Sequence, residues 1–383
     1  MRIIERLADI PQGVQVYLFG CGQAGQHLKK ILEHFRKDIT LLSWIDSFKN
    51  EGIDGLRVIK PDALPKTIKQ NEIVLIASVF WREIEKELIK QNIDNYLIIP
   101  YHFLRRQGFE ALKGSKDDPL LNPLCCELRF SSHDLEIYKE PLEKSLSLFG
   151  YNEDKKLYLL LTNQISKEIS PLTAITDYYY KTNINKEYLD FINFEQIYTI
   201  IEGGVFKGTI TLEFLKRLPQ NGMLYGFEPN WKDFQKSPLF PRLNKDPRVH
   251  IFPLGLWEKK TELGFKPDGA VSRIVEGSHS SCMLKINTIS IDQFVRENNI
   301  KRIDFIKMDI EGAEPKALSG SINTLTKHRP QLAISIYHDK RHMFEIPILL
   351  NKFLKDYVYR LGHYSCEYAE TILYAIPEEK CSQ

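Results

Sequence analysis

The sequence predicts an α/β protein with two Rossmann-like domains. In both halves of the chain, short apolar runs alternate with amphipathic helical patterns, as in parallel sheets that are covered by helices. Each half also has a glycine-rich turn between a predicted strand and a predicted helix. The length of 383 residues exceeds what a single core usually holds, so two domains are expected.

We expect an N-terminal Rossmann-like domain at 1–108, a connector at 109–150 and a C-terminal domain at 151–383. Hydrophobic content of 43% and charged content of 27% are typical of soluble globular proteins. The net charge of +2 gives no reason to expect a nucleic-acid partner. No secretory signal and no membrane-spanning run are recognised, and six cysteines without a CxxC motif indicate a reducing cytoplasm.

The N-terminal domain is predicted from four buried strands and two helices. Its strands are expected at 14–20, 41–46, 72–78 and 95–100. Between the first strand and the first helix, Gly20, Gly22 and Gly25 fit the GxGxxG pattern, and Asp46 ends the second strand. In dinucleotide-binding domains a carboxylate at that place binds the ribose, so this domain is a candidate site for NAD or a sugar nucleotide.

The C-terminal domain is expected to begin with helices over 155–195 and to continue as a sheet. Five parallel strands are predicted at 198–202, 223–228, 248–253, 303–309 and 331–337. The segments 356–365 and 371–377 are predicted to form a terminal antiparallel hairpin, which completes the sheet of a class I methyltransferase. The segment 266–281 is rich in glycine and serine, which fits either a mobile loop over the site or a plain surface insertion.

A nucleoside site is predicted at the first turn of this sheet. The strand ends at Glu202, glycines follow, and Glu228 ends the next strand, where a carboxylate can accept both ribose hydroxyls. S-adenosylmethionine (SAM) fits this layout best, although any strand-turn-helix needs small residues at its turn. The predicted cofactor-binding residues are Glu202, Gly203, Gly204, Gly208, Thr209, Glu228 and Gly255.

A second group of polar residues is predicted at the carboxyl ends of the fourth and fifth strands. Lys307 and Asp309 share one face, and His338 follows the neighbouring strand, about 4.8 Å away. These three are the candidate catalytic residues, with His338 as a base that Asp309 orients. Alternatively, Asp309, Glu311 and His338 hold a Mg²⁺ or Ca²⁺ ion; the metal-free version ranks slightly higher. For Glu314, stabilisation of a helix start is the preferred interpretation.

Residues 198–338 resemble the FkbM-type methyltransferase family. The resemblance is carried by IIEGGVFKG, YGFEPN, HIFPLGLW, NTISIDQFV, DFIKMDIEGAEPKALSG and AISIYH. It implies SAM-dependent O-methylation, often of a sugar or polyketide hydroxyl, and here we expect a sugar of a surface glycan or its precursor. Glu202, Gly204 and Gly208 match the family's cofactor turn, and Glu228 matches its ribose acid.

The chain departs from the family pattern in that turn. Glu202 stands where the family usually has Asp, and Val205 and Phe206 replace a small residue and an Asn. These changes leave SAM as the expected cofactor and alter the contacts expected for its methionine part.

Two rival functions remain at this stage. The N-terminal domain resembles the Rossmann-like N-terminal domains of bacterial glycan-modifying proteins, through WIDSF and GIDGLRVI. That resemblance implies sugar-nucleotide binding or a docking role. An NAD-dependent sugar-nucleotide oxidoreductase or epimerase would use a YxxxK pair. Tyr151 and Lys155 fit this pattern, and we interpret the match as chance. A non-catalytic nucleotide-binding scaffold is the other rival. The expected partners are a small-molecule or saccharide substrate and possibly a second copy of the chain.

Overall fold

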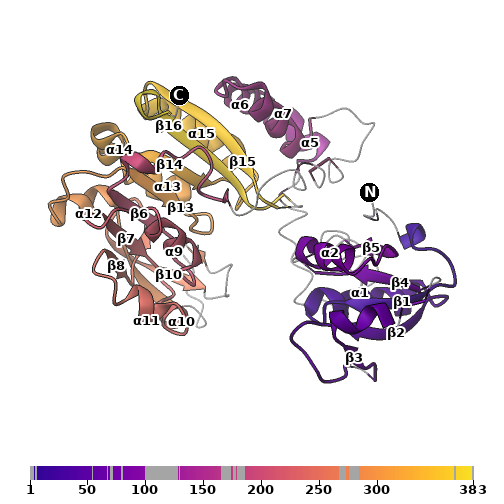
Figure 1. Ribbon diagram of the computed structural model, residues 1–383. Coiled ribbons are helices and arrows are strands. Elements are labelled where there is room, and N and C mark those ends of the chain that lie inside the picture. The colour runs from indigo at the N-terminus through magenta and orange to yellow at the C-terminus, as the bar shows by residue number, and fades with distance from the viewer. Residues whose placement is uncertain are drawn as a thin grey trace. The chain divides into compact units, whose positions relative to one another are not determined.

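The computed structural model (Figure 1) describes most of the chain as two compact units, 1–123 and 124–383, and each unit is considered by itself. The described residues are 4, 7–53, 55–66, 68–69, 72–78, 81–99, 128, 130–164, 174–175, 178, 186–266, 273–275, 284–365 and 368–381. Among them, no helix has the length and apolar character that crossing a membrane requires.

The N-terminal unit is built on a parallel five-stranded sheet in the order β3-β2-β1-β4-β5. The strands are β1 Gln15–Phe19, β2 Thr40–Ile45, β3 Val58–Ile59, β4 Glu72–Ile76 and β5 Tyr96–Ile98, and the helices are α1 Gln23–Phe35, α2 Trp81–Lys90 and the 3₁₀ turns Leu7–Asp9 and Pro61–Lys66. All four predicted strands are present. The short β3 was not predicted, because two residues give no periodicity.

Alternation along the strands places side chains in two cores, one on each face of this sheet. Val16 and Leu18 of β1 pack in the cluster that includes α1. Their neighbours Tyr17 and Phe19 pack in the cluster that includes α2. A strand that is buried on both faces shows a continuous apolar run, which is why the sequence revealed it.

The C-terminal unit contains a seven-stranded sheet in the order β15-β16-β14-β13-β6-β7-β8. The strands are β6 Thr199–Gly203, β7 Met223–Phe227, β8 Val249–Phe252, β13 Phe305–Met308, β14 Gln331–Ser335, β15 Tyr357–His363 and β16 Thr371–Pro377. Five strands are parallel, and β16 is antiparallel to both of its neighbours. This confirms the predicted sheet with its terminal hairpin, drawn in yellow in Figure 1.

Helices pack on both faces of this sheet. They are α5 Ser132–Ile137, α6 Lys139–Ser147, α7 Asn152–Leu161, α9 Thr209–Leu215, α10 Trp231–Gln235, α11 Phe240–Leu243, α12 Ile291–Glu297, α13 Glu314–Ser319, α14 Ile322–His328, α15 His342–Phe353 and the 3₁₀ turns Phe194–Gln196 and Glu378–Lys380. Ile200 and Phe305 lie in the core with α9, whereas Ile201 and Ile306 lie in the core with α12, α13 and α15.

Three segments differ from the sequence-based expectations or extend them. A four-stranded sheet, β11-β10-β12-β9, was not predicted; its strands are β9 Gly255–Leu256, β10 Thr261–Lys266, β11 Arg273–Val275 and β12 Leu284–Ile289. The segment 266–281 is predicted to be a loop, but residue 266 ends β10 and residues 273–275 form β11, so the prediction is wrong at these positions. The rest of the segment lies outside the described residues.

In the expected connector, α6 packs against α15 of the C-terminal unit. Much of the helical region predicted at 155–195 also lies outside the described residues.

The register of the parallel strands gathers the polar residues at one edge. Lys307 of β13 pairs with Glu202 of β6 on one side and with Ala333 of β14 on the other. The chain leaves all three strands in the same direction. The glycine turn after β6, Asp309 after β13 and His338 after β14 are consequently brought to one edge of the sheet.

A buried aspartate anchors the start of β6 and provides a stability test. Asp304 is 2% exposed, and its Oδ2 accepts hydrogen bonds from the backbone N–H groups of Tyr198 (2.9 Å) and Thr199 (3.0 Å). Asp304→Ala leaves these donors without their acceptor, so we expect a loss of about 2–4 kcal/mol in the free energy of unfolding, measured in urea. Glu262→Ala, which removes an exposed ion pair with Lys285, should leave the midpoint unchanged. If Asp304→Ala and Glu262→Ala lowered the free energy of unfolding equally, Asp304 would not be the anchor of β6.

Candidate functional site

The glycine turn after β6 is held so close to β13 that two of its positions require glycine. Gly204 has φ of +75°, and a Cβ there would lie 1.8 Å from the carbonyl oxygen of Asp309. Gly208 has φ of +83°, and a Cβ there would lie 2.3 Å from Leu243 Cδ1. Phe206, between them, is left-handed at φ 50° without being glycine. Asn and Gly tolerate that conformation better than a bulky side chain does, so Phe206 holds local strain.

Glu228 connects the end of β7 to this turn. Its Oε2 accepts a hydrogen bond from Phe206 N (2.7 Å), and its Oε1 accepts one from Asn230 N (2.7 Å). Burial raises the pKa of the Glu228 carboxyl, and the two backbone N–H groups oppose that shift. Each carboxylate oxygen can accept more than one hydrogen bond, so the group keeps capacity for a diol.

Glu202 is fully buried beneath the turn. Its Oε2 accepts a hydrogen bond from the Thr211 hydroxyl (2.8 Å), and its Oε1 has no hydrogen-bond partner among the described residues. Burial raises the pKa of the Glu202 carboxyl to about 7, although the Lys307 ammonium and the Thr211 hydroxyl favour its charged form. A buried carboxyl oxygen without a partner is costly, and a donor or a cation supplied by a ligand would relieve it.

Lys307 ties the turn to the next strand. Its Nζ donates to the carbonyl oxygens of Gly203 (3.1 Å) and Gly204 (2.6 Å), and it lies 3.9 Å from Asp309 Oδ2. The side chain is 3% exposed, and the ammonium lies 4.9 Å from the centre of the Tyr188 ring. These contacts suit a residue that positions the turn and Asp309.

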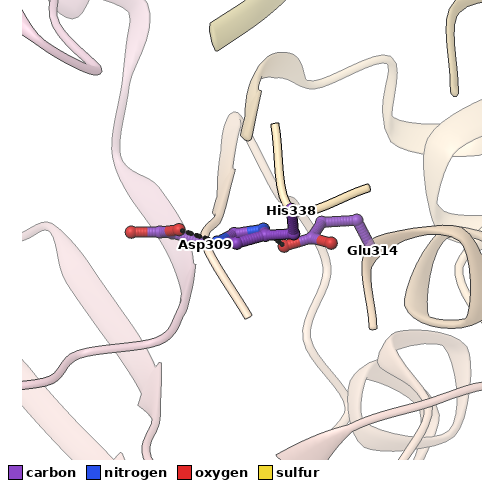
Figure 2. Close-up of side chains that lie close together, drawn as sticks. All are labelled: Asp309, Glu314 and His338. Atoms are coloured by element: carbon purple, nitrogen blue, oxygen red, sulfur yellow. Dashed lines mark ion pairs between the residues drawn. The ribbon is translucent and has the colours of Figure 1, made fainter. Parts of the chain in front are cut away.

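His338 lies among three carboxylates, of which Figure 2 shows Asp309 and Glu314. Its Nδ1 is 2.9 Å from Glu314 Oε1, and its Nε2 is 3.3 Å from Asp309 Oδ1 and 3.5 Å from Glu311 Oε2. Burial alone would lower the pKa of His338, but the carboxylates, Glu314 foremost, raise it to about 10. An imidazolium at neutral pH is no proton acceptor, which is a physical obstacle to the predicted role as a base.

The two acids that face Nε2 have opposite pKa shifts. Burial works against the charged form of Asp309, yet Lys307 and His338 hold the pKa of this carboxyl below its usual value. Burial raises the pKa of Glu311 to about 8, against the effect of the His338 cation. Glu311 also has a left-handed backbone at φ 54°, just before Gly312 at φ 96°. Such strain gathers at functional sites.

The sequence missed several residues of this cluster. Glu187 and Glu370 are close enough to Asp309 that burial and mutual repulsion raise the pKa of both. The Tyr188 hydroxyl lies 3.1 Å from Ser335 Oγ, and the Tyr337 hydroxyl donates to Asp309 Oδ1 over 3.4 Å. Glu187 and Glu370 belong to no recognised motif and lie far from Asp309 in sequence, so no local signal pointed to them.

Comparisons with known proteins agree with this architecture. Residues 214–361 match the model of the methyltransferase FkbM domain, a stretch that includes Glu228, Asp309 and His338. The C-terminal unit contains a methyltransferase FkbM domain. No curated protein sequence matches the chain.

One solved structure shows the same fold at low sequence identity. A methyltransferase FkbM from Methylobacillus flagellatus KT is 18% identical with a TM-score of 0.52, over 95% of this chain and 90% of that one. The O-methyltransferase TomG from Streptomyces achromogenes, solved in complex with SAM, is 10% identical with a TM-score of 0.31, over 66% of this chain and 98% of that one. The likeness to the first of these is one of fold.

The remaining predicted residues of the FkbM domain lie around the turn. Gly203 lies close to Leu256 of β9, since a Cβ on Gly203 would be 2.9 Å from Leu256 Cδ1. Gly255 precedes Leu256 and packs against side chains of the small sheet. Thr209 is exposed as the first residue of α9. Glu314 does accept a hydrogen bond from Ile310 N (2.9 Å) at a helix start, but it also pairs with His338.

The N-terminal unit repeats the arrangement around Glu228. Asp46 Oδ2 accepts a hydrogen bond from Cys21 N (2.9 Å) in the first turn, and Oδ1 accepts from Phe48 N and Lys49 N (both 2.9 Å). A Cβ on Gly25 would lie 1.8 Å from the carbonyl oxygen of Gly20, so helix α1 passes very close to the turn. In contrast, Gly22 has open space around it.

The buried Glu202 carboxyl predicts a pH dependence of stability. Its pKa is about 7 in the folded protein against an ordinary value of 4.5, so its contribution to stability is complete below pH 4.5 and is lost as the pH rises to about 7. In Glu202→Gln this loss is absent. We therefore expect the free energy of unfolding to fall from pH 5 to pH 8 by up to roughly 3 kcal/mol more in the native protein than in the variant. Urea titrations at both pH values test this, and parallel changes in the two proteins would refute it.

Proposed function

We propose that the protein is a SAM-dependent O-methyltransferase whose acceptor is a sugar hydroxyl in a surface glycan or its precursor. The observation that carries the proposal is the hydrogen bond from Phe206 N to Glu228. It fixes the acid that would bind a ribose diol against the glycine turn of an FkbM-type sheet. The sugar acceptor follows from the family resemblance.

The charges around the turn suit a sulfonium ligand. Glu202, with a buried Oε1 that lacks a hydrogen-bond partner, and Asp309 both lie beside the turn. Their negative charge favours a cofactor that carries a positive charge near its methyl group. In this arrangement the adenosine ribose is bound by Glu228, and the methionine part lies over the glycines.

The acceptor would bind at the adjoining strand ends. Methyl transfer needs the acceptor oxygen in line with the sulfonium methyl and a proton acceptor for the hydroxyl. Asp309 and His338 follow neighbouring strands and lie within 3.3 Å of each other, so one hydroxyl can contact both. We therefore assign Asp309 and His338 to the acceptor, and Lys307 to positioning.

Cofactor binding is the first test. SAM should raise the melting temperature of the native protein, and Glu228→Ala should weaken SAM binding at least about tenfold, because a hydrogen-bonded diol loses its acceptor. Isothermal titration calorimetry measures the affinity. Asp46→Ala is the matched control, since it removes the corresponding acid of the N-terminal unit and should leave SAM affinity unchanged. If Asp46→Ala weakened SAM binding and Glu228→Ala did not, SAM would bind to the N-terminal unit instead, and the proposal would be wrong.

Acceptor chemistry is the second test. His338→Ala should lower turnover by about 100-fold or more while SAM affinity survives, since the substitution removes a group on the acceptor side. Formation of S-adenosylhomocysteine in the presence of glycan acceptors gives the rate. Full activity in this variant would remove His338 from the mechanism.

A second nucleotide site in the N-terminal unit is supported by the contacts of Asp46. We propose that a nucleotide or sugar nucleotide binds there, with its ribose at Asp46. A melting-temperature increase with NAD(H) or a sugar nucleotide that is lost in Asp46→Ala would support this, and no increase in the native protein would count against it. The YxxxK pair of a short-chain oxidoreductase has another explanation, because the Tyr151 ring lies 3.9 Å from the Arg360 guanidinium.

A further inference from the structure

Both ring nitrogens of His338 face carboxylates. Nδ1 lies 2.9 Å from Glu314 Oε1, and Nε2 lies 3.3 Å from Asp309 Oδ1 and 3.5 Å from Glu311 Oε2. An ionised carboxylate only accepts hydrogen bonds, whereas a neutral imidazole carries a single N–H and would turn a lone pair toward one of the carboxylates. The geometry therefore fits the doubly protonated ring. In this form the ring has no lone pair with which to accept a proton or coordinate a metal ion.

The proposed methyl transfer consequently needs another proton acceptor. The two carboxylates beside Nε2 keep part of their side chains exposed, 26% for Asp309 and 23% for Glu311. Asp309 is held by further groups, since Lys307 Nζ lies 3.9 Å from its Oδ2 and the Tyr337 hydroxyl donates to its Oδ1 over 3.4 Å. A carboxylate that faces cations and donors in this way is a weak base, because they stabilise its charged form.

The carboxylate of Glu311 is held by fewer groups. In the part of the chain that the structure describes, its polar contact is the ion pair from Oε2 to His338 Nε2, and no hydrogen bond is made to Oε1. The residue also has a left-handed backbone at φ 54°, a strained conformation of the kind that gathers at functional sites. Glu311 therefore has a fixed direction and an oxygen that is available to a substrate hydroxyl.

We propose that Glu311 accepts the proton of the acceptor hydroxyl, and that the His338 cation, paired with Glu314 on its other side, positions the Glu311 carboxylate. This assignment deepens the proposed function and rests on it. As the O–H proton moves to Glu311, an electron pair of the hydroxyl oxygen forms the new bond to the methyl carbon. The bond between that carbon and sulfur breaks, and its electron pair stays on sulfur, which gives the neutral thioether of S-adenosylhomocysteine. Glu311 then releases the proton to solvent.

The charges that face Glu311 suit this role. Burial raises the pKa of Glu311 to about 8, and Asp309, Glu314 and Glu370 add to the shift, whereas the His338 cation opposes it. A base is most effective when its pKa lies near the working pH. The positive charge of a bound sulfonium would favour the ionised form of Glu311 further.

The state of His338 is tested without cofactor or acceptor. In ¹⁵N nuclear magnetic resonance spectra of histidine-labelled protein at pH 7, both ring nitrogens of His338 should carry a proton, and His338→Ala identifies their signals. Glu314→Gln keeps an oxygen for Ile310 N but removes the charge beside Nδ1, so the protonated fraction of His338 should fall. A neutral His338 ring in the native protein would overturn the proposal.

The role of Glu311 is tested by turnover at saturating SAM, with the methyl glycosides of glucose, galactose and mannose as acceptor probes. Glu311→Gln should lower kcat at least about 100-fold, while calorimetry finds SAM affinity within about twofold of the native value. Glu262→Gln is the matched control at an exposed acid and should keep full turnover. Formate, a small carboxylate, should raise the turnover of Glu311→Ala at least about tenfold without raising that of His338→Ala.

The outcomes separate this assignment from the proposed function. If the native protein is active and Glu311→Gln keeps turnover within about threefold of it, Glu311 is not the proton acceptor. The same conclusion follows if formate restores Glu311→Ala no better than His338→Ala. If the native protein forms no S-adenosylhomocysteine with any of the probes, the proposed function and the role of Glu311 are both overturned.

Discussion

The buried ammonium of Lys307 is the contact on which the rest of the site depends. It donates to the carbonyl oxygens of Gly203 and Gly204 and lies beside Asp309, so one side chain joins the turn after β6 to the end of β13. The Gly203 carbonyl also accepts a hydrogen bond from Asp309 N (3.1 Å), so a backbone contact and a buried cation together hold the turn against β13. The proposed cofactor turn and acceptor residues are consequently fixed relative to each other, which transfer over a short distance requires.

Negative charge is the second constraint on the site. Asp309, Glu311 and Glu314 surround His338, and Glu187 and Glu370 lie close enough to raise the repulsion further. Buried acids at such density are unfavourable unless cations balance them. Lys307 and the protonated His338 supply part of that balance, and the sulfonium that we propose would supply more. The negative charge that folding concentrates here therefore favours a positively charged ligand.

The two units use the same carboxylate arrangement at the end of their second strands. Glu228 and Asp46 each accept a hydrogen bond from a backbone N–H of the preceding glycine-rich turn and another from the residues that follow. The shared geometry follows from the topology, because the first and second strands of both sheets are parallel neighbours. Similar backbone geometry does not require the same ligand, and only the C-terminal unit has a charged cluster at the adjoining strand ends among the described residues.

The sequence by itself determined the two sheets, the glycine turns and the acids at the strand ends. These features depend on local rules: buried parallel strands are continuously apolar, and left-handed turns select glycine. The sequence did not predict the small sheet of β9 to β12, because its strands are short and partly exposed. Tertiary structure alone decided that Glu187 and Glu370 join the cluster, that Glu314 pairs with His338, and that Lys307 contacts the turn. Such contacts join residues far apart in sequence, and they are set by strand register and packing, which no local pattern encodes.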